Sequence, residues 1–258
     1  MMQPAIWLGV SLKMYFGYQQ TLNWSHAVAE NLRQHPAMIC GKVGLFILPA
    51  FPALTAVKAI FADTAIKTGA QDICQTEKGA WTGEVSASML AEIGCHFAEI
   101  GHAERRRHFF EDDDLIALKV AMALRHHLTP VLCLGEPEPV NADQAIDLCS
   151  RQLHANLKTA CQQHLAGEVI VAYEPQWAIG APQPAADRHI RTVCAGIKDS
   201  RPAGISLRVI YGGSAGPGLL QRLDGQVDGL FLGRFAHDPA ALCQIVDEAA
   251  ALVASSTG

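Results

Sequence analysis

The chain has 258 residues, of which 50% are hydrophobic and 17% are charged, and its formal net charge is −5. This length and apolar content suit one large core, and an acidic balance without a basic stripe argues against nucleic acid as a partner. The eight cysteines are scattered without a C-x-x-C pair or a Cys/His cluster, so we expect no disulfide framework, no metal site and no cofactor.

Two further features bear on location. Residues 1–4 lack the basic region and apolar core of a secretion signal. No apolar run approaches the ~20 residues needed to cross a bilayer. We therefore expect a soluble, cytoplasmic protein without a membrane partner, whose cysteines are mostly small buried side chains in a reducing compartment.

Eight short apolar runs recur along the chain, each about as long as a strand that is buried on both faces. In chain order they are Ile6–Leu12, Val43–Leu48, Ala65–Ala70, Phe97–Ile100, Pro130–Leu134, Val169–Ala172, Leu207–Tyr211 and Gly229–Leu232. The segments between them carry apolar residues at helical spacing, most clearly in Leu22–Leu32, Leu54–Phe61, Leu115–Leu124, Ala145–Leu157 and Pro239–Val253.

Strands that alternate with about eight helices imply an α/β fold of parallel strands joined by crossover helices. Two architectures fit this alternation: a closed (β/α)8 barrel and an open doubly wound sheet. The count of eight and the length near 250 residues favour the barrel. No Pro/Gly/Ser-rich linker divides the chain, so we expect a single domain over residues 1–258.

In such a barrel the working residues gather at the C-terminal ends of the strands. Lys13 follows the first strand, His102 and Glu104 follow the fourth, and Glu174 ends the sixth. Each has an ordinary alternative, because a strand-end glutamate can cap a helix, a lysine is usually solvated and a histidine can sit satisfied in a core. Arg106 and Arg107 fit a solvated helix start with ion pairs.

Glycines also cluster at the later strand ends. Backbone N–H groups come close to an oxyanion where glycines leave room, and barrels often bind phosphate after strands seven and eight. The glycines concerned are Gly180, Gly212, Gly213 and Gly233, and Ser214 and Arg234 directly follow two of them. A carboxylate, an imidazole, a lysine and a phosphate cradle together suit proton abstraction beside the carbonyl of a small phosphorylated sugar.

Four segments resemble the triosephosphate isomerase family, in order and over essentially the whole chain. They are Gly79–Glu84, Gly101–Arg106, Ala172–Gly180 and Tyr211–Ser214. The resemblance implies a TIM barrel and an isomerase of the aldose–ketose or ketose–ketose type. Glu174 would shuttle the proton, and a neutral His102 would polarise the carbonyl, which is the established division of roles in this family. Lys13 would hold the anionic substrate, with Glu104 behind it.

The same resemblance assigns further roles. Residues 175–181 would form a lid over the phosphate, which would accept backbone N–H bonds from residues of the cradle. The stretch Gln71–Glu84 resembles the loop that docks into a partner subunit, with Thr82 near the neighbour's site. It implies a homodimer; the alternative is an ordinary surface loop.

The chain departs from the family pattern around one pocket. The family's Asn two residues before the lysine is Ser11, and its Ser after the histidine is Ala103. The second lid hinge reads Ala181-Pro182-Gln183-Pro184, and Arg234 replaces the second glycine of a Gly-Gly pair. Prolines restrict the hinge, the shorter Ser11 leaves room, and the Arg234 guanidinium points either to phosphate or to solvent.

These departures leave several functions open. The first expectation is the three-carbon reaction between glyceraldehyde 3-phosphate and dihydroxyacetone phosphate, a glycolysis-like step of carbohydrate metabolism. The altered pocket gives a second candidate, a four-carbon tetrulose phosphate such as L-erythrulose 1-phosphate. A third is a non-catalytic sensor of sugar phosphates, although a pure binder has no need of Glu174, His102 and Lys13. A phosphate-binding barrel for an indole or nucleotide precursor would not explain the Glu174 segment.

Overall fold

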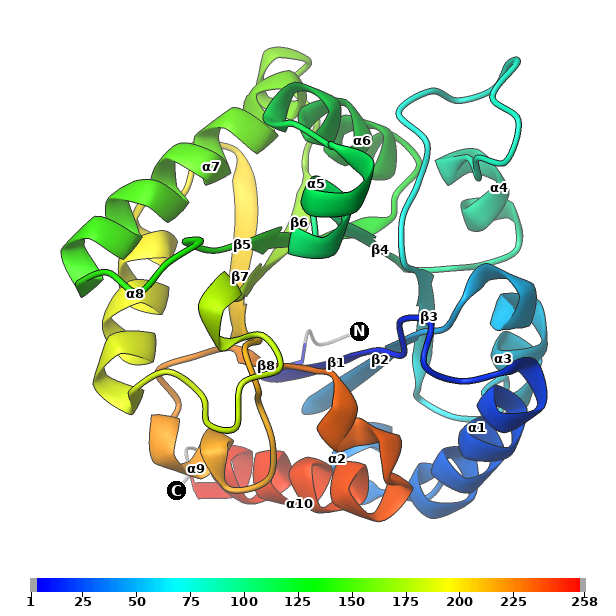
Figure 1. Ribbon diagram of the computed structural model, residues 1–258. Coiled ribbons are helices and arrows are strands. Elements are labelled where there is room, and N and C mark those ends of the chain that lie inside the picture. Colours follow the sequence, from blue (N-terminus) through cyan, green and yellow to red (C-terminus); the bar gives the residue numbers. More distant parts are fainter. Residues whose placement is uncertain (1–3, 256–258) are drawn as a thin grey trace.

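The computed structural model describes residues 4–255. Residues 1–3 and 256–258 lie outside the described residues. Both stretches belong to the domain expected over residues 1–258, and residues 1–3 belong to the segment expected to lack a secretion signal. In the described part, eight parallel strands close into a barrel in the order β1 to β8, so the (β/α)8 expectation is confirmed. Figure 1 shows the strands as an inner ring with the helices around it.

All eight apolar runs form strands, and only their ends shift. The strands are β1 Ile6–Ser11, β2 Val43–Leu48, β3 Lys67–Ala70, β4 Phe97–Ile100, β5 Thr129–Leu134, β6 Gly167–Tyr173, β7 Ile205–Tyr211 and β8 Gly229–Leu232. Register pairs such as Val10↔Ile47 and Val10↔Leu232 join β1 to both β2 and β8, which closes the ring.

Helices fill the connections between strands, as the periodic segments predict. They are α1 Tyr18–Leu32, α2 Pro36–Ile39, α3 Leu54–Ile60, α4 Ala87–Glu92, α5 Ala103–Phe109, α6 Asp113–Arg125, α7 Ala142–Gln162, α8 Asp187–Asp199, α9 Leu219–Leu223 and α10 Pro239–Ser255. The longest, α7, begins with a capping box in which Asn141 and Gln144 satisfy each other's backbone N–H groups. Short 3-10 turns occur at η1 Phe51–Ala53, η2 Gln176–Ala178 and η3 Arg234–His237.

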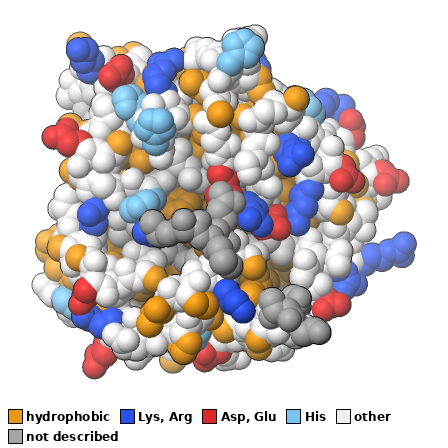
Figure 2. Space-filling model, turned by 180° about the vertical axis from the view of Figure 1, so that it is seen from behind, with side chains coloured by type: hydrophobic (Ala, Val, Ile, Leu, Met, Phe, Trp, Pro, Cys, Tyr) orange, Lys and Arg blue, Asp and Glu red, His pale blue; other side chains and the backbone are white. Residues whose placement is uncertain are grey.

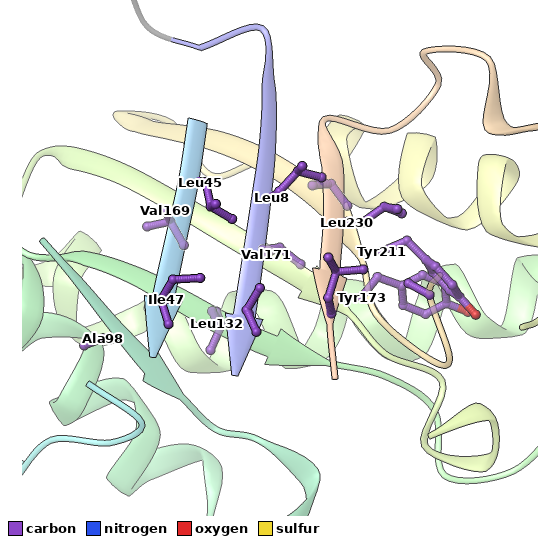
Figure 3. Packing of buried hydrophobic residues seen from close by; sticks show 14 of the residues in the cluster. Leu8, Leu45, Ile47, Ala98, Leu132, Val169, Val171, Tyr173, Tyr211 and Leu230 are labelled. Atoms are coloured by element: carbon purple, nitrogen blue, oxygen red, sulfur yellow. The ribbon is translucent and has the colours of Figure 1, made fainter. Parts of the chain in front are cut away.

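Strand alternation divides the core into two layers. On β6, Val169, Val171 and Tyr173 belong to the layer between strands and helices, where Figure 3 shows the rings of Tyr173 and Tyr211 close together. Ile170 and Ala172 belong to the other layer, inside the barrel. Because side chains alternate along a strand, the next inward residue is number 174. Strand geometry therefore delivers Glu174 into the barrel mouth.

The bottom of the barrel interior is plugged by aromatic rings from four strands. Trp7, Phe46, Phe97 and Phe231 contact one another there, and the Phe46 and Phe97 rings stack with centroids 4.4 Å apart. This packing fills the interior, so no channel runs through it, and any site must lie above it, at the C-terminal ends of the strands.

On the face shown in Figure 2, basic and acidic side chains are interspersed, so neither positive nor negative charge forms a large patch there. Within residues 4–255, no helix is both long and apolar enough to cross a membrane.

Candidate active site

A cavity of about 300 Å³ opens at the C-terminal ends of the strands. Nine of the residues expected at the site line it, at or after the ends of β1, β4, β6, β7 and β8, and they are Ser11, Lys13, Glu104, Glu174, Gly180, Gly213, Ser214, Gly233 and Arg234. His102, also expected there, is not among the lining residues. This volume suits a small molecule, and barrel closure brings together groups that lie up to 223 residues apart, as Ser11 and Arg234 do.

Glu174 is held at the cavity by backbone on both sides. Its N–H donates to the carbonyl of Leu134 on β5 at 2.7 Å. Its side chain lies so close to Gly212, after β7, that a Cβ added there would stand 2.3 Å from Glu174 Cγ. Only glycine fits at residue 212 with the carboxylate in this place, so one of the strand-end glycines makes room for the proposed base.

His102 caps α5, and this contact determines which ring nitrogen carries the proton and which one faces Glu174. Its Nδ1 accepts a hydrogen bond from the N–H of Glu104 at 3.1 Å, so the proton of the neutral ring is on Nε2. Nε2 lies 3.4 Å from Oε2 of Glu174, and both residues are buried, with 3% and 8% of their surface exposed.

These two facing atoms have no hydrogen-bond partner among residues 4–255. Ala103, which follows His102, has no hydroxyl that could bond to the glutamate. Buried polar atoms are nearly always satisfied, and exceptions mark functional sites. A donor N–H and an acceptor carboxylate are therefore left available to a ligand.

Lys13 completes the cationic part of the site. Its backbone is in the left-handed region, with φ of 50°, and its carbonyl accepts from the side-chain amide of Gln71. Nζ donates to Oε1 of Glu104 at 2.7 Å, which is the supporting contact expected for Glu104. Burial lowers the pKa of Lys13, but the bond to Glu104 and the charge of Glu174 outweigh it, so the net shift is upward.

A second buried carboxyl lies beneath the site, and the sequence analysis did not single it out. Glu99 on β4 accepts a hydrogen bond of 2.7 Å from the hydroxyl of Ser11 on β1. Both side chains are buried, and burial raises the pKa of Glu99 to about 7 in spite of the opposing influence of His102 and Ser11. Its only sequence signal is a charged residue within an apolar run.

Residues expected to form the phosphate cradle are hydrogen-bonded to the segment expected to form the lid. Ser214 Oγ shares its one proton between the carbonyls of Ala178 and Ala181, at 3.0 and 2.7 Å. The guanidinium of Arg234, an exposed residue that lines the cavity, donates to the carbonyl of Gly180 at 2.9 Å. Gly180 has φ of +73°, a conformation that glycine adopts without strain.

The first half of the lid is anchored by Glu136, which the sequence analysis missed. Its Oε1 accepts from the hydroxyl of Tyr173 at 3.1 Å and from the indole N–H of Trp177 at 3.0 Å. At the other end, the hydroxyl of Tyr211 accepts from the N–H of Ala185 at 3.0 Å. The segment 175–184 is thus tied at both hinges.

Two arginines after the fourth strand were expected at a solvated helix start with ion pairs. Arg106 pairs with Asp113 and also bonds to the carbonyl of Gly101 and to Asn156, so it braces α5 against α6 and α7. Arg107 is exposed, as expected, and it also lines the cavity. Thr82 is exposed and does not line this cavity.

Across residues 4–255 no group of three or more His, Cys, Asp or Glu side chains is arranged to hold a metal ion. The family model of triosephosphate isomerase matches residues 6–249. The chain belongs to the triosephosphate isomerase family.

Among curated relatives, the chain is similar to an L-erythrulose-1-phosphate isomerase of Pectobacterium atrosepticum. The two are 55% identical over 245 residues, which is 94% of this chain and 95% of the relative. An L-erythrulose-1-phosphate isomerase of Rhizobium etli is 35% identical over 98% of this chain and 95% of its own length. One of Rhizobium rhizogenes is 34% identical, covering 98% of both.

Membership of this family makes the chain an isomerase of sugar-phosphate type, so the expected enzyme class is confirmed. The sensor interpretation loses its support.

Proposed function

We propose that this isomerase acts on a phosphorylated four-carbon ketose of the L-erythrulose 1-phosphate class, and not primarily on triose phosphates. The name shared by relatives at 55% and 35% identity supports this choice. The single observation that carries the reaction type is the pair of buried, unsatisfied atoms, Nε2 of His102 and Oε2 of Glu174, 3.4 Å apart.

The chemistry of such a substrate fixes which carbons react. A 2-ketose that carries phosphate on C1 has only one carbonyl neighbour with a free hydroxyl, which is C3. Proton loss from C3 gives a 2,3-enediolate, and proton return to C2 moves the carbonyl to C3. In dihydroxyacetone phosphate the corresponding neighbour is a terminal CH₂OH carbon, so the four-carbon compound differs by one hydroxymethyl group at the reacting carbon.

Each group of the site has a separate role in this reaction. Glu174 takes the proton from C3 and returns it to C2, as a carboxylate held within reach of both carbons. The N–H at Nε2 of His102 donates to the oxygens on which negative charge develops. Lys13, whose pKa is raised, stays cationic beside the enediolate. Backbone N–H groups of the cradle, including Gly213 and Gly233, bind the phosphate.

The lid contributes by excluding water. Its bonds through Ser214 and Tyr211 bring residues 175–184 over the cradle. An enclosed enediolate is protected from loss of phosphate and from proton exchange with solvent. The guanidinium of Arg234, now on the carbonyl of Gly180, is placed to transfer to the phosphate when ligand enters.

Turnover tests the substrate directly. The kcat/KM for L-erythrulose 1-phosphate is compared with that for glyceraldehyde 3-phosphate, using coupled assays at one pH. We expect the four-carbon compound to exceed the three-carbon compound by at least about 100-fold, a span typical of pocket-based discrimination. A larger kcat/KM for glyceraldehyde 3-phosphate would overturn the proposal and restore the three-carbon reaction.

We further propose that the enzyme is a cytoplasmic homodimer. The segment between β3 and α4 projects from the barrel in Figure 1 and carries the exposed ring of Trp81 beside Thr82. Met14, next to the catalytic Lys13, is 92% exposed, as expected for a side chain that a partner covers. Sedimentation of wild type and Trp81→Glu tests this: a dimer that the substitution dissociates is expected, and a monomeric wild type would contradict it.

A further inference from the structure

The hydrogen bond between Ser11 and Glu99 crosses the barrel interior. β1 and β4 are not neighbours in the ring, since β2 and β3 stand between them. Ser11 lines the cavity, whereas Glu99 is 3% exposed and lies two residues above Phe97 of the aromatic plug. A carboxyl buried next to aromatic rings costs stability, and a purely structural pairing here would be served as well by apolar side chains.

This bond decides what Ser11 can offer a ligand. A hydroxyl has one proton and two acceptor lone pairs. When Glu99 is ionised, the proton of Ser11 is directed to Oε2 of Glu99 at 2.7 Å, so only lone pairs face the cavity. Ser11 can therefore accept from a substrate hydroxyl, but it cannot donate to a carbonyl or enediolate oxygen. An amide at this place would offer a donor.

Two carboxylates also line the cavity, but Glu174 is the proposed base and Glu104 accepts from Lys13, so the groups left to bind the rest of the ligand are mainly donors. The N–H at Nε2 of His102, the ammonium of Lys13 and the backbone N–H groups of the cradle suit the enediolate and the phosphate, which are acceptors. A ligand hydroxyl that donates its proton finds no acceptor among these donors. Given the proposed function, on which this step rests, the four-carbon substrate carries one such group more than a triose phosphate, on its hydroxymethyl carbon.

We propose that Ser11 and Glu99 together form the subsite for this hydroxymethyl group: Ser11 accepts its O–H, and Glu99 is the positioning residue that holds the serine proton away. The charged and titratable groups that face Glu99 are Lys13, His102, Cys133 and Glu174. The pair selects four-carbon over three-carbon ligands, and it leaves the proton transfer itself to the remaining residues.

Unreactive ligands test this without turnover. Inhibition constants are measured for erythritol 4-phosphate and for glycerol 3-phosphate at pH 8, in wild type, Ser11→Ala, Glu99→Gln and the double variant. The preference of wild type for the four-carbon ligand is expected to fall about tenfold in each single variant. It should fall no further in the double variant, because the two side chains act as one unit.

Controls come from the far ends of two strands, where Ser206→Ala on β7 and Glu168→Gln on β6 should leave the preference unchanged. A preference that stays within twofold of wild type in both Ser11→Ala and Glu99→Gln overturns the subsite. If Glu99→Gln does not fold, Ser11→Ala, which removes one hydroxyl, decides alone. Wild-type turnover of triose phosphates only would refute the proposed substrate, whereas unchanged ligand preference in the variants would refute only the subsite.

Discussion

The wall of the site, which is the buried pair of His102 and the cavity-lining Glu174, differs in construction from the rim formed by Gly180, Ser214 and Arg234. The wall is buried and is fixed by backbone, through the N–H of residue 104 and the close approach of Gly212. The rim is partly exposed and is held by side-chain bonds to lid carbonyls. Side-chain bonds of this kind can exchange when a ligand binds. The fold thus fixes the two groups to which we assign the proton transfer, whereas the side-chain bonds of the rim can rearrange.

Replacing the base tests the wall most severely. In Glu174→Gln the amide cannot accept the carbon-bound proton, so kcat should fall about 10⁴-fold, at the upper end of general-base effects. The inhibition constant of glycerol 3-phosphate should change little, because the cradle is intact. Glu30→Gln, an exposed site on α1, is the control; a loss of less than tenfold in kcat would remove Glu174 from the mechanism.

Removing the imidazole donor should cost less. His102→Gln loses the N–H that faces the developing oxyanion, and a drop in kcat of about 10² to 10³ is expected. Steady-state kinetics with the four-carbon substrate measure it, and His26→Gln on the exposed face of α1 is the control. An effect confined to KM would show that His102 binds substrate without stabilising the charge.

The floor of the cavity gives a stability prediction. Burial raises the pKa of Glu99 from 4.5 to about 7, so between these values the folded protein holds a proton that the unfolded chain has released. Stability from Glu99 is therefore full below pH 4.5 and is lost as pH rises through 7. Glutamine does not titrate, so Glu99→Gln should gain about 2 kcal/mol relative to wild type between pH 5 and pH 8.

Urea unfolding of both proteins at these two pH values measures that gain. Because every other titrating group is common to the pair, the difference isolates Glu99. A gap that is the same at pH 5 and pH 8 would mean that this carboxyl is ionised in the folded protein throughout the range.

The rim gives the smallest effect. Arg234→Ala removes the bond to the carbonyl of Gly180 and a guanidinium at the cavity wall. Glycerol 3-phosphate should bind about tenfold more weakly, the worth of one charge-assisted hydrogen bond, with kcat within threefold of wild type. Arg201→Ala, on the surface before β7, is the control. A large fall in kcat with unchanged affinity would place Arg234 in the chemical step instead.

The sequence predicted most of the framework. Eight apolar runs became eight strands, because strands buried on both faces need continuous apolar segments. The third began two residues later than expected, at Lys67, and the sixth extended through Tyr173. Lys13, Glu104 and Glu174 were recognisable as site residues because parallel strands place their C-terminal ends on one face.

Other residues of the site could not be predicted from local sequence patterns. Glu136 anchors the lid through Tyr173 and Trp177, which are 37 and 41 residues away. Arg107 was interpreted as a solvated residue at the start of a helix; it is exposed, but the sequence did not show that it also lines the cavity. Helical and strand periods report which face a side chain takes, but not what stands opposite that face.

The amino-acid sequence by itself determined the order of strands and helices, the inward direction of Glu174 and the membership of the family. Only the tertiary structure decided that Ser11 donates to Glu99, 88 residues further along the chain, and that Arg234 binds the lid. The reason is physical: alternation is a local property of the backbone, whereas the partner of a buried polar group depends on which strands face each other once the barrel has closed.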